Sequence, residues 1–150
     1  MPQLQILNSK EKKEILKLIE NQWAAKLKLN CALLKNNKNR VFIINKDISK
    51  IELEKLRINS IGMYFCDLEH GIRLSIEGSQ IIGPKAAKNI VEIDEGQVKQ
   101  WFRGEDLEIN ENFDGFVIIK NKDDFLGTGK YKNSRILNYV SKRRRITSMV

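Results

Sequence analysis

The sequence predicts an α+β protein of two compact domains, in which a helix with a mostly antiparallel sheet precedes a small β-barrel. Apolar residues near the start of the chain recur at helical spacing. Most later apolar stretches are short, strand-like and separated by polar turns. With 150 residues, 41% of them hydrophobic, the chain can bury a substantial core in one domain or in two small ones.

The first element is an amphipathic helix over residues 9–25. Asn8 followed by Glu11 resembles a capping box, and Ser9 is an alternative cap. The apolar stripe of this helix consists of Ile15, Leu18, Ile19 and Trp23. Lysine and glutamate are mixed on the other face, which is typical of a solvated surface.

Strands and turns follow the helix in the predicted first domain. Alternation or short apolar runs predict strands at residues 27–33, 41–44, 60–66 and 72–76, with turns at 36–39 and 68–71. Asp47 is predicted to cap a short helix that contains Ile48 and Ile51, and Ser79 to cap another before Gly83-Pro84. We expect the domain boundary near Ala87, which divides the chain into domains 1–87 and 88–150.

The second domain is predicted to be mainly β-structure. A strand at residues 89–93 leads through Asp94-Glu95-Gly96 into a short helix over 97–103, and Gly104 suits its C-terminal end. Further strands are expected at 115–120, 125–131 and 136–140, and a polar turn at 121–124 joins the first two. Glycines at 115, 127 and 129 indicate bends, bulges or close approaches that would let short strands curl into a barrel.

Acidic and basic residues are segregated along the sequence of the second domain. The whole chain carries a net charge of +8, whereas residues 88–125 hold five Lys/Arg and ten Asp/Glu. Residues 126–150 hold seven Lys/Arg and no Asp or Glu. This pattern favours a polyanion, with nucleic acid ahead of an anionic membrane surface. Two alternatives stay open: a merely solvated basic run at 142–145, and core packing instead of base stacking for Tyr131 and Tyr139.

The sequence contains few residues in arrangements that catalysis or metal binding requires. His70 is the one histidine and falls in a predicted turn, while Cys31 and Cys66 are expected to be buried thiols without zinc spacing. Asp123-Asp124 suits a turn better than a magnesium site. Gly127-Thr128-Gly129-Lys130 lacks the spacing of a phosphate-binding loop. We therefore expect no catalytic residue, no metal and no cofactor, and an enzyme acting through His70 is the least supported class.

The N-terminal residues lack the apolar core of a signal peptide, and no apolar run is long enough to span a membrane. We expect a cytoplasmic monomer that does not associate with membranes.

The order of elements after residue 88 resembles a PUA domain, a small pseudobarrel that binds RNA. The matching features are the strand at 89–93, the Asp94-Glu95-Gly96 helix start, and the strands that begin with GFVII and FLGTG. Upstream, the strand at 72–76 and its Gly-Pro segment resemble the end of a pre-PUA α/β domain. This layout is similar to Nip-type ribosome-biogenesis proteins and to archaeal PUA proteins grouped with Nop/Sun-type RNA methyltransferases.

The resemblance implies RNA contact through the helix and later strands of the barrel. The residues carried over are Lys99 and Arg103 on the helix, and Lys130, Lys132 and Arg135 around the third strand. Lys142, Arg143, Arg144 and Arg145 are added as much for their charge as for the match. The acidic pairs Glu105-Asp106 and Asp123-Asp124 flank this set, so the domain is not expected to present one uniformly basic face.

The function expected from residues and resemblance together is non-catalytic binding of structured RNA in ribosome biogenesis or RNA modification. Ribosomal RNA is favoured and transfer RNA is possible. The alternative is an adaptor whose N-terminal domain docks an RNA methyltransferase or an assembly factor, while the basic tail only steers that protein to RNA. Whether the first 87 residues contact RNA or protein stays open.

Overall fold

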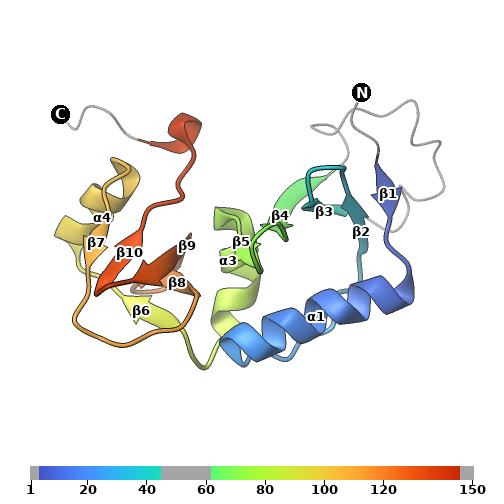
Figure 1. Cartoon of the computed structure of the whole chain (residues 1–150), viewed down its shortest axis with the longest axis horizontal. Coiled ribbons are helices and arrows are strands. Elements are labelled where there is room, and N and C mark those ends of the chain that lie inside the picture. Colours follow the sequence, from blue (N-terminus) through green and yellow to red (C-terminus); the bar gives the residue numbers. More distant parts are fainter. Residues whose placement is uncertain (1–3, 45–61, 146–150) are drawn as a thin grey trace.

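A computed structural model of the chain describes residues 4–44 and 62–145, which form two sheets side by side (Figure 1). The first sheet has the order β1-β2-β3-β4-β5 and is antiparallel throughout. The second has the order β6-β8-β9-β10-β7, in which the β6–β8 pair is parallel. This arrangement of helices and sheets confirms the predicted α+β class.

The elements of the first half are β1 (Gln5–Ile6), α1 (Ser9–Trp23), β2 (Ala32–Lys35), β3 (Arg40–Ile44), β4 (Met63–Asp67), β5 (Arg73–Leu74), α3 (Ile76–Ile82) and the 3₁₀ turn η3 (Gly83–Lys85). Those of the second half are β6 (Ile90–Glu92), α4 (Glu95–Phe102), β7 (Leu107–Glu108), β8 (Phe116–Asn121), β9 (Asp124–Lys132), β10 (Arg135–Leu137) and the 3₁₀ turn η4 (Lys142–Arg144). The predicted helix that contains Ile48 and Ile51, and the predicted start of a strand at 60–61, lie outside the described residues.

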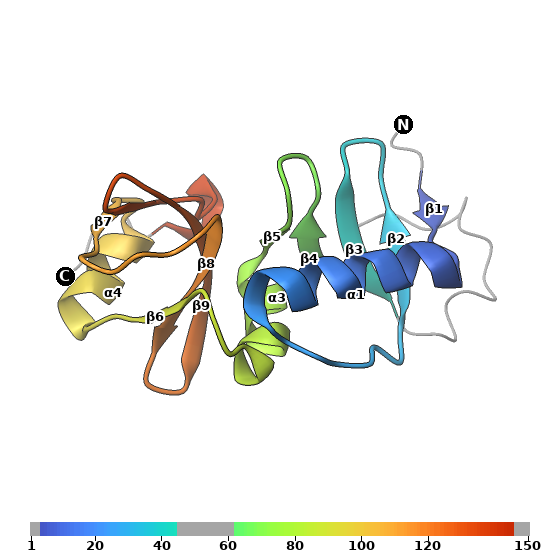
Figure 2. The ribbon, with the colours of Figure 1, turned by 60° about the horizontal axis from the view of Figure 1, so that its bottom comes forward.

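Helix α1 lies along the first sheet (Figure 2) and begins with the predicted capping box, in which Asn8 and Glu11 exchange side-chain and backbone hydrogen bonds. Its buried stripe is Ile15, Ile19 and Trp23, at four-residue spacing. Placing Leu18 in this stripe was wrong, because its side chain is 43% exposed. Leu16 packs against the core instead.

The predicted strand at 27–33 was wrong over its first part, because β2 begins only at Ala32. The expected alternation of burial is present, since Leu27 and Leu29 face the core while Lys28 is exposed. However, the ammonium of Lys12 donates hydrogen bonds to the carbonyl oxygens of Leu29 and Cys31, both at 2.5 Å. The side chain of Lys12 therefore donates the hydrogen bonds that these carbonyl oxygens would accept from a neighbouring strand in a sheet.

Two further boundaries differ from the prediction. Ser75, not Ser79, caps α3 by accepting a hydrogen bond from the backbone N–H of Gly78, so the predicted strand at 72–76 stops at Leu74. The strand predicted at 136–140 ends at Leu137. Beyond it, Asp106 Oδ1 and Asn138 Oδ1 accept the N–H groups of Asn138 and Val140, so these donors bond to side chains and not to a strand.

Gly127 marks a close approach between the two halves, as its position in a strand predicted. Its φ of +101° lies in the region that favours glycine, and a Cβ there would stand 3.2 Å from a side-chain carbon of Ile76. Its N–H donates to Ser79 Oγ at 2.8 Å, and the neighbouring Thr128 Oγ1 donates to the Leu74 carbonyl at 2.9 Å. Strand β9 is thereby fixed against the first half.

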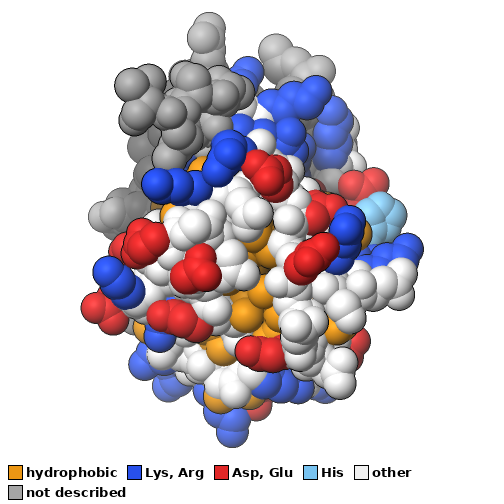
Figure 3. Space-filling model, turned by 90° about the vertical axis from the view of Figure 1, so that its left-hand side faces the viewer, with side chains coloured by type: hydrophobic (Ala, Val, Ile, Leu, Met, Phe, Trp, Pro, Cys, Tyr) orange, Lys and Arg blue, Asp and Glu red, His pale blue; other side chains and the backbone are white. Residues whose placement is uncertain are grey.

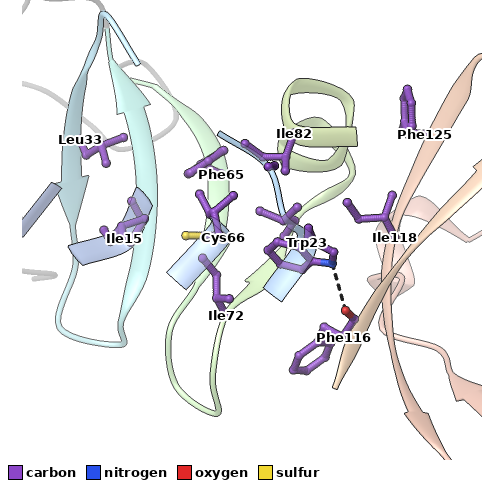
Figure 4. Close-up of a cluster of buried hydrophobic side chains, with 14 of the residues drawn as sticks. Ile15, Trp23, Leu33, Phe65, Cys66, Ile72, Ile82, Phe116, Ile118 and Phe125 are labelled. Atoms are coloured by element: carbon purple, nitrogen blue, oxygen red, sulfur yellow. Dashed lines mark hydrogen bonds between the residues drawn. The ribbon is translucent and has the colours of Figure 1, made fainter. Parts of the chain in front are cut away.

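One hydrophobic cluster includes residues from both halves (Figure 4). Trp23 and Ile82 from the first half belong to the same cluster as Phe116, Ile118 and Phe125 from the second. A second cluster around Trp101 fills the space between α4 and the second sheet. Shared burial of this kind holds the two halves in a set orientation. Among the described residues, no helix is long and apolar enough to cross a membrane.

Candidate nucleic-acid interface

A cleft of about 430 Å³, here called the central cleft, lies where the two halves meet. Its wall from the first half comes from the start of β3, from β4 and β5, and from the start of α3. Its wall from the second half comes from β9 and from residues 139–144. Five cationic side chains line it, namely Arg40, Arg73, Lys142, Arg143 and Arg144. Glu77 is the one carboxylate among the described residues of its lining.

A buried carboxylate positions the two arginines of the first half. Asp67 is 6% exposed, and its Oδ2 lies 3.5 Å from Nη2 of Arg73 and 4.0 Å from Nε of Arg40. Asp67 Oδ1 accepts a hydrogen bond from the N–H of Glu69 at 2.8 Å, which fixes the carboxylate in turn. One negative charge thus anchors two positive ones, and the trio keeps a net positive charge at the cleft.

Tyr139 forms part of the opposite wall and is held between neighbours. The guanidinium carbon of Arg73 lies 4.9 Å from the centre of its ring, within the range of a cation–π contact. Phe116 contacts the same ring in an edge-to-face arrangement at 5.3 Å between centroids. Tyr139 is nevertheless 40% exposed. The sequence left core packing open for this residue, and the structure places it at the surface of the cleft.

The turn η4 carries the basic residues that the sequence singled out. Arg144 Nη1 pairs with Glu77 Oε1 at 2.7 Å and so bridges the two halves. Lys142 and Arg143 are exposed, and no carboxylate within residues 4–44 and 62–145 pairs with either of them. Arg145 differs, because its Nε donates to the Val140 carbonyl at 3.0 Å and its side chain packs over Gly104.

Tyr64, beside Arg40, has a buried hydroxyl that makes no hydrogen bond to any described residue. Burial raises the pKa of this phenol, and the positive charge of Arg73 opposes the rise only in part. The guanidinium carbon of Arg40 lies 5.7 Å from the centre of the Tyr64 ring. The Tyr64 ring thus supports Arg40 at the edge of the cleft.

The remaining predicted residues lie on other parts of the second half. Lys132 and Arg135 are paired across β9 and β10, and Arg135 also pairs with Glu108 at 3.6 Å. Lys130 is exposed on β9, as are Lys99 and Arg103 at α4, and Arg103 pairs with Glu105 at 3.5 Å. Figure 3 shows the end of the molecule that carries α4 and β7, where Asp and Glu surround an apolar strip. The expectation that this domain lacks one uniform basic face agrees with that view.

Sequence reasoning missed Arg40 and Arg73 as members of the site. Each lies at a strand terminus in the half whose charge signs are mixed, and no local motif sets either apart. Only the packing of the two halves places them opposite η4. His70 is exposed in the predicted turn, and among the described residues no cluster of His, Cys, Asp or Glu could hold a metal ion.

Comparison with known families identifies the second half. Residues 88–146 match the family model described as the methyltransferase RsmF PUA domain. The second half is a PUA-type domain. The resemblance drawn from the sequence is thereby confirmed, and the basic turn η4 and Tyr139 belong to the PUA domain.

Curated relatives are similar over part of their length. The chain is 31% identical over 86 residues to ribosomal RNA small subunit methyltransferase F of Aeromonas salmonicida. It is 28% identical over 88 residues to the protein of the same name from Vibrio cholerae. These matches cover 56% and 57% of the chain but only 18% and 19% of the relatives, so the chain spans about a fifth of their length.

A solved structure resembles the whole chain, including the half before the PUA domain. A conserved PUA domain protein from Thermoplasma acidophilum superimposes with a TM-score of 0.63, covering 95% of this chain and 97% of that one. At 15% identity, this likeness shows a shared fold.

Proposed function

We propose that this protein binds ribosomal RNA through its PUA domain and acts in ribosomal RNA modification without catalysing the reaction itself. The curated relatives are named as methyltransferases of small-subunit ribosomal RNA, and residues 88–146 match the family model of the methyltransferase RsmF PUA domain. On this proposal methyl transfer belongs to a separate protein. Transfer RNA is the second RNA class to test.

The observation that carries the proposal is the exposed pair Lys142 and Arg143 on the fixed turn η4. Both lack a carboxylate partner among the described residues. Three arginines, Arg40, Arg73 and Arg144, line the central cleft together with them. Cations held at fixed positions suit phosphate oxygens, and each phosphate contact adds to a salt-dependent affinity. Lys130, Lys132, Arg135, Lys99 and Arg103 are proposed as a second, weaker contact region, since carboxylates pair with two of them.

The proposal is tested with the double variant Lys142→Ala/Arg143→Ala. Binding to a small-subunit ribosomal RNA transcript and to transfer RNA is measured between 50 and 300 mM salt. The slope of log affinity against log salt should become shallower by about 1.4, at roughly 0.7 for each lost contact to unpaired RNA. The control Lys26→Ala/Lys28→Ala removes the same charge next to α1 and should leave the slope unchanged. Absence of binding by the wild-type protein to either RNA would overturn the proposal.

Crosslinking in the protein's own cells, followed by sequencing of the attached RNA, tests the RNA class. Reads concentrated on one element of small-subunit ribosomal RNA are expected. Reads spread over transfer RNAs would replace the ribosomal assignment with a role in transfer RNA modification.

An adaptor is the second candidate function. The observation that favours it is a shallow groove beside α1 that Leu16, Leu27 and several lysines line; Leu18 is an exposed apolar residue elsewhere on the same helix. An adaptor would bind RNA weakly alone and tightly only with its protein partner. Comparison of RNA affinity with and without the cellular partner recovered by affinity purification separates the two functions.

We also propose that the boundary between the two domains lies near Ala87. The division of the sheets between β5 and β6 supports this position, as does the start of the family match at residue 88. The hydrophobic cluster that both halves share argues that the two domains fold together, although each has its own sheet.

A further inference from the structure

We propose that the central cleft is the binding site for a single unpaired nucleotide of the RNA, whose phosphate meets η4 and whose base packs on the Arg73–Tyr139 pair. This inference rests on the proposed function and deepens it, because it names the RNA element that is recognised. It also assigns a role to Arg40 and Arg73, which lie outside the PUA domain.

The size of the cleft favours one nucleotide over a duplex. A volume of about 430 Å³ lies in the range of sites that enclose a small molecule. A double-stranded helix cannot enter such a space, whereas a bulged or looped nucleotide can leave the stack and do so. Proteins that read RNA most often recognise unpaired nucleotides of this kind.

The charges of the cleft suit the phosphate of that nucleotide. Lys142 and Arg143 stand exposed on one wall, while Arg73 and Arg40 stand on the other. The ion pairs of Asp67 orient the two arginines without neutralising both. A phosphate between these walls therefore meets cations from both halves of the protein, and the planar guanidinium groups of the arginines suit its oxygens.

The exposed ring of Tyr139 provides a surface on which the base can stack. Its ring is 40% exposed in the cleft wall, while Arg73 and Phe116 hold it at 4.9 and 5.3 Å. Bases of unpaired RNA stack on aromatic rings and on arginine planes, and the Arg73–Tyr139 pair supplies both. Because neighbours already fix the ring, little rotational freedom is lost when the base binds.

The two walls are also held at a fixed separation. Arg144 pairs with Glu77 across the cleft at 2.7 Å, and Thr128 Oγ1 bonds to the Leu74 carbonyl at its floor. Asn138, next to Tyr139, donates from its side chain to the carbonyl oxygens of Trp101 and Glu105 at 2.8 and 2.9 Å. The cleft is thus formed before any ligand arrives.

The test compares an RNA hairpin with one bulged nucleotide to the same hairpin without the bulge, at 150 mM salt. Wild-type protein should prefer the bulged RNA by about 10-fold, the effect of one stacked base. Tyr139→Leu should lose that preference, whereas Tyr139→Phe, which keeps the ring, should retain it. All variants should bind the fully paired hairpin with the affinity of the wild type, which shows that they are folded and keep their phosphate contacts.

Phe113→Leu is the matched control outside the cleft. It makes the same kind of change, from an aromatic ring to leucine, at a partly buried residue that does not line the cleft, so the preference for the bulged RNA should not change. A peptide of six glutamates is the control for charge alone and should not displace the bulged RNA at equal concentration.

The outcomes separate this inference from the proposed function. Equal affinity of wild-type protein for both hairpins, or an undiminished preference in Tyr139→Leu, would overturn the nucleotide site and leave RNA binding in place. Displacement by the acidic peptide would likewise overturn it in favour of a protein ligand. Failure to bind either hairpin or ribosomal RNA would overturn the proposed function itself, and the nucleotide site with it.

Discussion

The indole N–H of Trp23, near the end of α1, donates to the backbone carbonyl of Phe116 in β8 at 3.0 Å (Figure 4). The two residues stand 93 positions apart in the chain, one in each half. Gln22 Nε2 donates to the same carbonyl at 2.9 Å, and Asn89 Nδ2 donates to the Gln22 carbonyl at 2.7 Å. The end of α1 is therefore a hydrogen-bonded joint between the two sheets.

Trp23→Phe tests this joint. The change removes one hydrogen bond and leaves a gap in a fully buried site, so the free energy of unfolding should fall by about 2 kcal/mol. The variant keeps Trp101 as its one tryptophan, so fluorescence reports on the second half while circular dichroism reports on both. In urea the two signals should follow a single transition, because the hydrophobic cluster spans both halves.

Leu18→Ala is the matched control on the same helix. Because Leu18 is 43% exposed, its truncation should change the free energy of unfolding by less than about 0.5 kcal/mol. Separate transitions for fluorescence and circular dichroism in Trp23→Phe would contradict a shared core.

Gly127→Ala and Gly71→Ala separate steric contact from backbone strain. Both glycines have positive φ, +101° and +90°. A Cβ at Gly127 would press on Ile76, whereas a Cβ at Gly71 would meet nothing within 4 Å. The alanine at 71 should cost about 1 kcal/mol of backbone strain, and the alanine at 127 about 2 kcal/mol or more, in chemical denaturation. Equal costs would show that Gly127 is needed for its backbone conformation alone.

Local chemistry explains why several elements were predictable. Asn8 with Glu11 was recognised as a helix start, and Asp94 was recognised as leading into α4, where the structure adds a capping box with Gln97. Gly104, with φ of +87°, follows α4 as expected. These signals act within a few residues, so the sequence contains all of their partners.

Two of the errors arose where a distant residue decides the local structure. Lys12 donates hydrogen bonds to the carbonyl oxygens of Leu29 and Cys31, and Asp106 accepts one from the N–H of Asn138, across 17 residues or more. The site follows the same rule. Lys142 and Arg143 were predicted from charge density, whereas Arg73 joins them only because Asp67 and Tyr139 hold it at the meeting of the two halves.

Cys66 should make the protein less stable in alkaline solution. Burial raises the pKa of its thiol well above the ordinary value of 9.0, and nearby Asp67 raises it further. The unfolded chain therefore loses this proton at lower pH than the folded one, so stability is full below pH 9 and falls as the pH rises above it. The slope from this group approaches about 1.4 kcal/mol per pH unit.

Urea titrations at pH 8, 9 and 10 measure this effect. Cys66→Ala removes the ionisable group, and its free energy of unfolding should decline less steeply over that range than that of the wild type. The control Ile19→Val changes an equally buried side chain that has no ionisable group and should keep the wild-type slope. Parallel slopes for Cys66→Ala and wild type would show that the thiol does not ionise on unfolding.

Glu77→Gln should strengthen RNA binding. Glu77 places a negative charge in the lining of the central cleft and holds Arg144 at 2.7 Å, so this arginine is neutralised in the free protein. The amide keeps the size of the side chain and can still accept a hydrogen bond, but it releases a full positive charge for phosphate. Affinity for small-subunit ribosomal RNA at 150 mM salt should rise several-fold, and the salt slope should steepen by roughly 0.7.

Glu20→Gln removes the same charge from α1, where Glu20 pairs with Lys26 at 3.8 Å, and should change neither quantity. Weaker binding by Glu77→Gln would mean that RNA needs the bridge between Arg144 and Glu77 more than it needs the freed charge.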